Sequence, residues 1–324
     1  MNISSRKSDY QYGLEDCDVL DRDSLKAFRA KRDEWLYWLE HDEHHAISKQ
    51  ITGMLWSDAV FRLINESRKF AHEAGDGYST QSGIIASSLD RGYVAEQVIS
   101  FRKLMEKGAR DPEKQVISLR RLIDDIRKNR HLLTREMFVC HDGLPYDCDC
   151  GIEELPEPNE NGVSFGYLDT RGPRAFYMSR LMHEAFDRMM EKAPAKRGRK
   201  DRIGDAFFQE IEDALSAAPF DELRQHANKI LLHAADEFSR GKRSGGGITL
   251  DNVWICHKAI LMVANRVSVA IGGSNIGAVP TPQFDVLENW SAPFAPEAKF
   301  EELLNQWRKE NDLREDWCQE LFRT

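Results

Sequence analysis

The chain has 324 residues, of which 41% are hydrophobic and 31% are charged, a balance typical of a folded protein with a well-charged surface. Its 54 Asp and Glu residues outnumber 45 Lys and Arg residues, so the formal net charge is −9 and the molecule as a whole repels nucleic acids and anionic membranes. Six scattered cysteines exclude the disulfide framework of a small secreted module and are expected to be reduced thiols.

The sequence predicts neither a targeting segment nor a membrane span. No apolar run approaches the roughly 18 residues that a span needs, and the first ten residues, MNISSRKSDY, lack the apolar stretch of a signal peptide. We therefore expect a soluble, cytoplasmic protein without membrane contact.

The first part of the chain predicts an arm followed by four helices. Residues 1–20 are polar and acidic without an apolar period, which favours a flexible N-terminal arm. Apolar residues then recur at steps of three and four, which predicts helices from Ser24 to about residue 45, over 47–71, over 84–105 with a break near Gly92, and from Pro112 to about residue 126. Because their connections are short, these helices are expected to be antiparallel neighbours.

Two pairs of polar residues in this region are spaced as partners on one helix face. His41 and His45 lie one turn apart, like metal ligands, but Asp42 stands where a zinc protease carries glutamate, so a solvated helix end is favoured over a metal site. Asp58 and Arg62 have i,i+4 spacing, for which an ion pair within the helix is favoured over a catalytic role.

A cluster of soft ligands lies in the segment CHDGLPYDCDC. It brings Cys140, His141, Cys148 and Cys150 within eleven residues, a density that zinc can use. Their spacing lacks the paired two-residue gaps with which a zinc knuckle wraps the ion, so an ordered loop with incidental thiols is favoured. No cofactor or metal ion is predicted for the chain.

Together with the rest of the chain, these helices are predicted to form one helical domain over residues 21–290. In it, two helical layers, 21–135 and 171–290, are joined by a loop at 136–170. Helices are predicted over 176–189, 207–215 and 249–271, the last capped by Thr249. His257 lies on the apolar stripe of this last helix, where a hydrogen-bonded core histidine is favoured over a catalytic one.

Two short amphipathic helices, with stripes beginning at Phe300 and Leu313, are predicted within residues 291–324. They can dock on the bundle or form a dimer contact. The expected fold class is all-α, a helical bundle.

The densest basic segment is KAPAKRGRKDR, residues 192–202, which has six basic residues and one acidic residue. An exposed connector of this charge is either a phosphate-binding site or merely a solvated loop; for the first case we predict RNA contacts for Lys196, Arg197, Arg199 and Lys200. No aromatic residue interleaves with these cations, so base stacking is not predicted there.

The most informative stretch is DELRQHANKILLHAADEFSR, from Asp221, a predicted helix cap, to Arg240. One face of the predicted helix is an apolar stripe that packs on a core, formed by Leu223, Ala227, Ile230, Ala234 and Phe238. The other face is titratable and carries His226, Lys229, His233 and Arg240. This helix is therefore predicted to have a packing side and a working side.

The segment NKILLHAAD, from Asn228 to Asp236, resembles the HEPN superfamily, in particular its abortive-infection branch, and the segments 118–136 and 251–267 are similar to that branch too. The resemblance implies a four-helix core with additional flanking helices, commonly a homodimer. It also implies that an arginine and a histidine four to six residues apart meet their counterparts across the two-fold axis and cleave RNA without a metal ion. Phage defence or a toxin system is the implied context.

Carried over to this chain, His233 matches the histidine and Asn228 stands where the arginine would be. Histidine can exchange protons near neutral pH, whereas asparagine cannot supply the charge with which arginine holds the phosphate. Lys229 can substitute as a point charge, Arg224 or Arg240 can reach the site, or catalysis can be absent.

The competing hypothesis is a non-catalytic helical binding or scaffold protein with a degenerate HEPN site. In that case His233 is a helix-flank histidine bonded to a neighbouring carbonyl, and the surface binds a protein partner or a nucleotide.

Overall fold

The computed structural model describes residues 10–73, 83–109, 111–149, 169–226, 249–273, 276, 281–288, 290 and 296–320. The chain divides into two compact units, Met1–Pro280 and Thr281–Thr324. Apart from one antiparallel bridge between Thr134 and Arg202, every regular element in the described residues is a helix, which confirms the all-α class.

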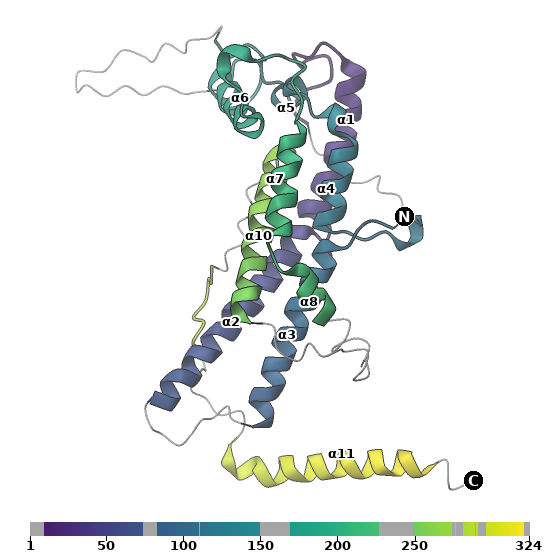
Figure 1. Ribbon diagram of the computed structural model, residues 1–324, viewed down its shortest axis with the longest axis vertical. Helices are drawn as coiled ribbons and strands as arrows, with labels where there is room; N and C mark the ends of the chain where they lie inside the picture. The colour runs from purple at the N-terminus through teal and green to yellow at the C-terminus, as the bar shows by residue number, and fades with distance from the viewer. Residues whose placement is uncertain are drawn as a thin grey trace, which may run out of the picture. The chain divides into compact units, whose positions relative to one another are not determined.

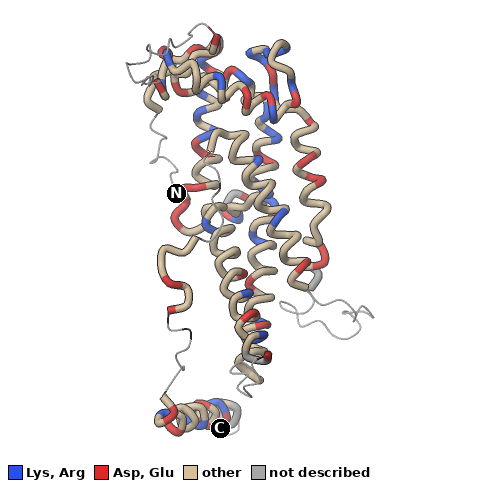
Figure 2. Tube along the Cα trace, turned by 90° about the vertical axis from the view of Figure 1, so that its left-hand side faces the viewer, with Lys and Arg blue, Asp and Glu red and all other residues tan. Residues whose placement is uncertain are grey.

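The first unit is a bundle of long helices with shorter helices at one end (Figure 1). Its α-helices are α1 (Arg22–Leu36), α2 (Ile47–Glu73), α3 (Ile84–Met105), α4 (Leu119–Lys128), α5 (Arg135–Cys140), α6 (Phe176–Met190), α7 (Asp205–Ser216), α8 (Phe220–His226) and α10 (Leu250–Ala270). α2 packs along α3 and α7 along α10, while α10 also contacts α2 and α6. α5 and α6 pack on each other at the upper end, where basic and acidic residues are interspersed (Figure 2).

Helix α10 is a core helix of this bundle. It begins with a capping box, in which the Thr249 hydroxyl accepts from the Asn252 amide at 3.1 Å and the Asn252 side chain accepts from the Thr249 amide at 3.1 Å, as predicted for Thr249. By length and composition alone it can cross a membrane, contrary to the expectation from the sequence, but 56% of its most apolar window is buried. The buried residues include Val253, Ile260 and Val267, which line the bundle interior.

Several helix boundaries differ from the prediction. Asp21, not Ser24, caps α1, because its carboxylate accepts the Asp23 and Ser24 amides at 3.0 Å. α3 continues through Gly92 without a break. The helix predicted from Pro112 is a single 3-10 turn, Pro112–Lys114, and α4 starts only after its own cap, Ser118.

Two further segments were assigned the wrong structure. Residues 136–140 were predicted to belong to the loop 136–170 but lie in α5 (Arg135–Cys140), which Thr134 caps. At the other end of the chain, α11 (Phe300–Glu320) is one continuous helix and not two short ones. The polar residues between its two apolar stretches, such as Asn311 and Asp312, leave the helix intact, since they make no break in backbone hydrogen bonding.

The described part of the N-terminal arm, residues 10–20, is packed on the bundle, unlike the flexible arm that was expected. The Tyr10 hydroxyl donates to Asp33 Oδ1 at 2.7 Å, and the Arg29 guanidinium lies 4.2 Å from the centre of the Tyr10 ring. Cys17 is 6% exposed. These contacts join residues far apart in the chain, so the periodicity of the sequence does not predict them.

Candidate functional site

The predicted catalytic residues Asn228, Lys229 and His233 lie outside the described residues, as does Arg240. The helices on both sides of that segment are described. α8 precedes it and is anchored by Leu223, which is 2% exposed, and by Phe220, whose ring meets Phe101 of α3 edge-on at 5.8 Å. Helix α8 starts at Phe220, so Asp221 lies in its first turn and does not cap it.

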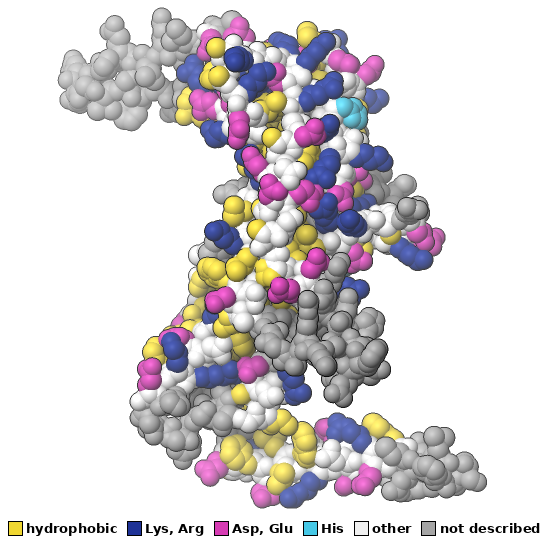
Figure 3. Space-filling model, in the orientation of Figure 1, with side chains coloured by type: hydrophobic (Ala, Val, Ile, Leu, Met, Phe, Trp, Pro, Cys, Tyr) yellow, Lys and Arg dark blue, Asp and Glu magenta, His cyan; other side chains and the backbone are white. Residues whose placement is uncertain are grey.

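The basic segment 192–202 is only partly free to contact a ligand. Arg197 donates twice to Asp187 Oδ2, at 2.6 and 2.9 Å, and Arg199 donates to Glu136 at 2.8 Å and Asp18 at 2.9 Å. Lys196 and Lys200 are exposed. Of the four predicted RNA contacts, two are therefore engaged in ion pairs within the protein and two face solvent. Figure 3 shows Lys and Arg side chains mixed with acidic ones at this end of the molecule.

A wholly buried arginine holds this segment against the bundle. Arg135 of α5 has no exposed surface, and its guanidinium lies 2.7 Å from Asp187 Oδ1 and 3.0 Å from Asp201 Oδ2. Burial raises the pKa of Asp187. Hydrogen bonds from Arg197 and Arg135 outweigh this effect and keep the pKa below its ordinary value. The backbone amide of Arg135 also donates to the Asp201 carbonyl at 2.8 Å. The cluster thus ties the basic segment to α5 and α6.

Within the described part of the cysteine–histidine cluster, Cys140 and Cys148 are buried and His141 is half-buried. Cys140 has no exposed surface and Cys148 is 5% exposed, while Cys150 lies outside the described residues. Burial lowers the pKa of His141 to about 3, so its ring is neutral at neutral pH, with Nδ1 3.1 Å from the Phe138 carbonyl. Among the described residues, no group of three or more His, Cys, Asp or Glu side chains is arranged to hold a metal ion.

His41 and His45 lie at the end of the π-helical turn Tyr37–His41 and just after it. Asp42 accepts the His45 amide at 2.6 Å and the Tyr37 hydroxyl at 2.8 Å, so its carboxylate is occupied by turn contacts.

A buried polar network joins α2, α3 and α10. The Asp58 carboxylate, 4% exposed, accepts the Tyr93 hydroxyl at 2.5 Å and Arg62 Nε at 2.8 Å. The ion pair predicted for Asp58 and Arg62 is confirmed, and the Asp58 carboxylate in it is buried. The network also includes Tyr93 and Gln97 of α3, which were not predicted as site residues. A polar residue on the apolar face of a helix is the sequence signal that could have identified Gln97.

His257 is a hydrogen-bonded core histidine, as predicted. The Gln97 amide nitrogen donates to the Met54 carbonyl at 3.0 Å, which turns the Gln97 oxygen toward His257 Nε2 at 2.8 Å. Nε2 therefore carries the proton, and Nδ1 faces the Asp58 carboxylate at 3.8 Å. Burial lowers the pKa of His257 to about 4, despite the neighbouring charge of Asp58, so the ring is neutral at neutral pH.

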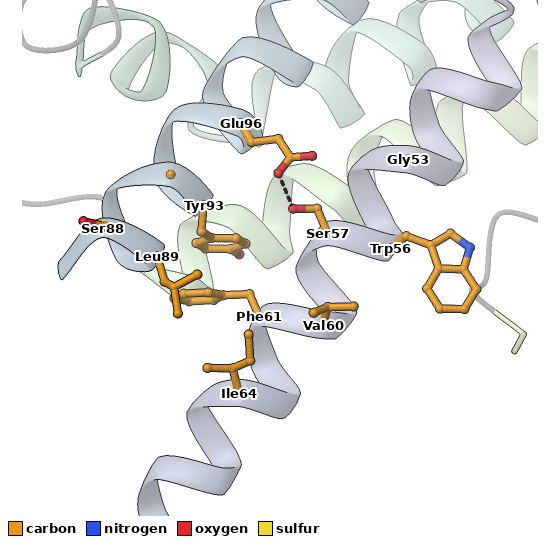
Figure 4. Close-up of a pocket in the computed structure, with 11 residues that line it drawn as sticks. Gly53, Trp56, Ser57, Val60, Phe61, Ile64, Ser88, Leu89, Tyr93 and Glu96 are labelled. Carbon is orange, nitrogen blue, oxygen red and sulfur yellow. Dashed lines mark hydrogen bonds between the residues drawn. The ribbon is translucent and has the colours of Figure 1, made fainter. Parts of the chain in front are cut away.

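A groove opens on the outer side of this network, between α2 and α3 (Figure 4). It has a volume of about 580 Å³ and is lined mainly by apolar side chains, with the Ser57 hydroxyl donating to Glu96 at 2.6 Å on its rim. The rings of Phe61 and Tyr93 stack at 3.8 Å within it. Tyr93 lines the groove and its hydroxyl donates to Asp58, so this residue belongs both to the groove wall and to the buried network. The surface suits an apolar ligand with a polar or cationic end near Glu96.

Comparison of the chain with protein families, curated proteins and solved structures finds no match.

Proposed function

We propose that the chain is a HEPN-like helical protein that cleaves RNA without a metal ion, with His233 as its general acid and base. One observation supports this beyond the sequence pattern: the segment that carries Asn228, Lys229 and His233 is joined at both ends to helices of the bundle core. It follows α8, which is anchored on α3, and precedes α10, which is capped at Thr249. An all-α bundle is the fold that the resemblance requires.

In the proposed reaction, neutral His233 takes the proton of a ribose 2′-hydroxyl and a protonated imidazole returns one to the leaving 5′-oxygen. Lys229, four residues earlier, supplies positive charge to the phosphorane in place of the missing arginine. The cellular setting we propose is cytoplasmic, as a homodimer in phage defence or a toxin system.

The exposed Lys196 and Lys200 are the proposed RNA contacts outside the catalytic segment. Helix α7, 12 residues long, separates them from α8, which corresponds to about 18 Å along the helix axis. We expect an RNA that spans this distance to contact both α8 and these lysines. Arg197 and Arg199 act in this proposal by holding the segment in place through their ion pairs.

The test is RNA cleavage by the purified full-length protein in the presence of EDTA. His233→Ala should lower the rate by at least about 100-fold with an unchanged helical circular dichroism spectrum. His44→Ala, which removes an exposed histidine far along the chain from the predicted helix, is the control and should keep the activity. Equal cleavage by wild type and His233→Ala would exclude this histidine as the catalyst.

A second candidate function, a non-catalytic binding protein, is favoured by the groove between α2 and α3. Its ligand would be an apolar helix of a protein partner with a basic residue opposite Glu96. Under this alternative, wild-type protein cuts no RNA. An apolar fluorescent dye should bind in the groove of the wild-type protein, and Leu89→Glu should weaken that binding. Ile99→Glu is the matched control, because Ile99 lies on the same helix outside the groove and both side chains are 37% exposed.

A further inference from the structure

Arg199 of the basic segment is bound both by the N-terminal arm and by the bundle. Its Nη2 atom donates to Asp18 Oδ1 of the arm at 2.9 Å, and its Nη1 atom donates to the Asp18 carbonyl at 3.0 Å. Nη1 also donates to Glu136 of α5 at 2.8 Å, and the guanidinium lies 4.2 Å from the centre of the Tyr146 ring. The arm and α5 therefore share this one cation.

The two acidic partners of Arg199 differ in their exposure to water. The Glu136 side chain is 7% exposed and also accepts the Leu20 amide at 3.1 Å, so it is an internal partner. The Asp18 side chain is 44% exposed, and that of Arg199 is 26% exposed. An ion pair with this much contact with water contributes little to stability, and a dissolved anion can compete for it. Asp18 is therefore the partner that a ligand can replace.

The residues next to Arg199 favour a polyanion as that ligand. An arginine fork binds a phosphate as it binds a carboxylate, through N–H groups that lie in one plane. Lys196, Lys200 and Arg202 of the same chain segment are exposed and can meet neighbouring phosphates. The Asp18 carboxylate thus occupies the place at which a phosphate of a bound RNA would meet Arg199.

We propose that the N-terminal arm is an autoinhibitory contact, in which Asp18 covers Arg199 and is displaced when an RNA phosphate binds this arginine. The inference rests on the proposed function for the RNA contacts of Lys196 and Lys200, and it concerns binding and not cleavage. In the bound state Arg199 keeps Glu136, so the basic segment stays on α5. Its Nη2 atom then faces the RNA, and the segment gains one further cation for binding.

The contacts around Asp18 provide a reporter of this displacement. Asp18 Oδ2 accepts the Tyr146 amide at 2.8 Å, and the thiol of the preceding residue, Cys17, lies 3.1 Å from Arg29 Nη2. Cys17 is 6% exposed while the arm is in place. When Asp18 leaves Arg199 and Tyr146, the chain next to it loses its anchor, and the Cys17 thiol becomes accessible to a reagent in solution.

RNA affinity tests the competition in the full-length protein. The probe is a fluorescein-labelled polyuridylate oligonucleotide, and every protein carries His233→Ala so that cleavage does not enter the measurement. Asp18→Asn should lower the Kd at least about 5-fold and steepen the plot of log Kd against log salt concentration by about 0.7, the increment for one more phosphate contact with a single strand.

Asp16→Asn is the matched control. It removes the same charge from the same arm, but Asp16 accepts the Gly13 amide at 3.1 Å, and no contact joins it to Arg199 among the described residues. This variant should change the Kd less than about 2-fold and leave the salt dependence as it is. Equal effects of Asp16→Asn and Asp18→Asn, or no RNA binding by either variant, would overturn the proposal.

A double variant tests whether Arg199 is the cation that is released. In an Arg199→Gln background Asp18→Asn should leave the Kd unchanged, because no guanidinium remains to be freed. Circular dichroism checks that each variant is folded. A gain in affinity of the same size with and without Arg199 would mean that Asp18 acts through general charge alone, contrary to the proposal.

Thiol labelling follows the arm without a substitution in it. Mass spectrometry of the tryptic peptide of residues 8–22 reports the modification of Cys17 in the His233→Ala protein. Saturating oligonucleotide should raise the labelling rate of Cys17 at least about 5-fold, whereas Cys256, buried in α10, should label at an unchanged rate. A constant Cys17 rate would show that RNA leaves the arm in place and would refute the inference. Wild-type protein that releases the arm on RNA without cutting it would contradict only the proposed reaction.

Discussion

His257 illustrates, at the scale of one residue, how burial sets the chemistry of a titratable side chain. Its ring is 3% exposed and lies between Gln97 and the Asp58 carboxylate, and burial lowers its pKa from 6.5 to about 4. Above pH 6.5 the ring is neutral in both the folded and the unfolded chain, so protonation does not affect the unfolding equilibrium. Between pH 6.5 and 4 only the unfolded chain takes up the proton.

We therefore predict that His257 makes the free energy of unfolding fall as the pH drops from 6.5 to 4, by about 3 kcal/mol in total for this group. Urea unfolding of His257→Gln at several pH values should show a shallower dependence, by about one proton, because glutamine does not titrate. His44→Gln, at an exposed histidine, is the control. A variant with the same pH dependence as wild type would contradict the assignment.

At the scale of one element, α3 and the turn after α5 show opposite uses of glycine. Gly92 lies inside the continuous helix α3, and a Cβ there would meet no atom within 4 Å. Gly143 has a φ of 84°, and a Cβ there would lie 2.4 Å from Cγ of Tyr12. The first glycine is a helix-weakening residue in open space, while the second is required by backbone conformation and by the packing of the N-terminal arm.

These positions give a paired prediction. Gly92→Ala should raise the free energy of unfolding by about 0.5–1 kcal/mol, because alanine favours the helix and fits without a clash. Gly143→Ala should lower it, since alanine is strained at positive φ and collides with the Tyr12 ring. Urea denaturation of the two variants measures both effects. Stabilisation by Gly143→Ala would mean that the arm is not packed as described.

At the scale of the whole molecule, the division into two compact units predicts that the bundle folds by itself. The core cluster of buried residues runs from Cys17 to Ile276 and includes none of the described residues of 281–324. A chain ending at Pro280 should therefore keep its cooperative thermal transition, with a melting temperature within about 2 °C of the bundle's transition in the full chain. Thermal circular dichroism measures this, and a large decrease would show that the bundle depends on the C-terminal unit.

Several features could be predicted from the sequence because they depend on neighbours along the chain. The helical period identified α2, α6, α7 and α10, and a local capping signal identified Thr249. The core position of His257 followed from its place on an apolar stripe. The prediction of a charged helix pair at Asp58 and Arg62 rested on four-residue spacing, which is also a local property.

The candidate site was predicted less completely. The sequence singled out the basic segment, but it did not show that Arg197 and Arg199 are bound to Asp187, Asp18 and Glu136 while Lys196 and Lys200 remain exposed. Charge counts along the chain cannot distinguish a cation held by an internal carboxylate from one that faces solvent. The groove was not predicted either, since it exists only where α2 and α3 lie side by side.

By itself the sequence determined the all-α class, most helices and the chemical character of their faces, because hydrophobic period and capping act over a few residues. The tertiary structure decided that Arg135 is wholly buried, that residues 10–20 pack on the bundle, and that Asp58, Tyr93, Gln97 and His257 form one network. Each of these depends on which distant segments meet. Burial then determines whether a charged or titratable group stabilises the fold or remains available to a ligand.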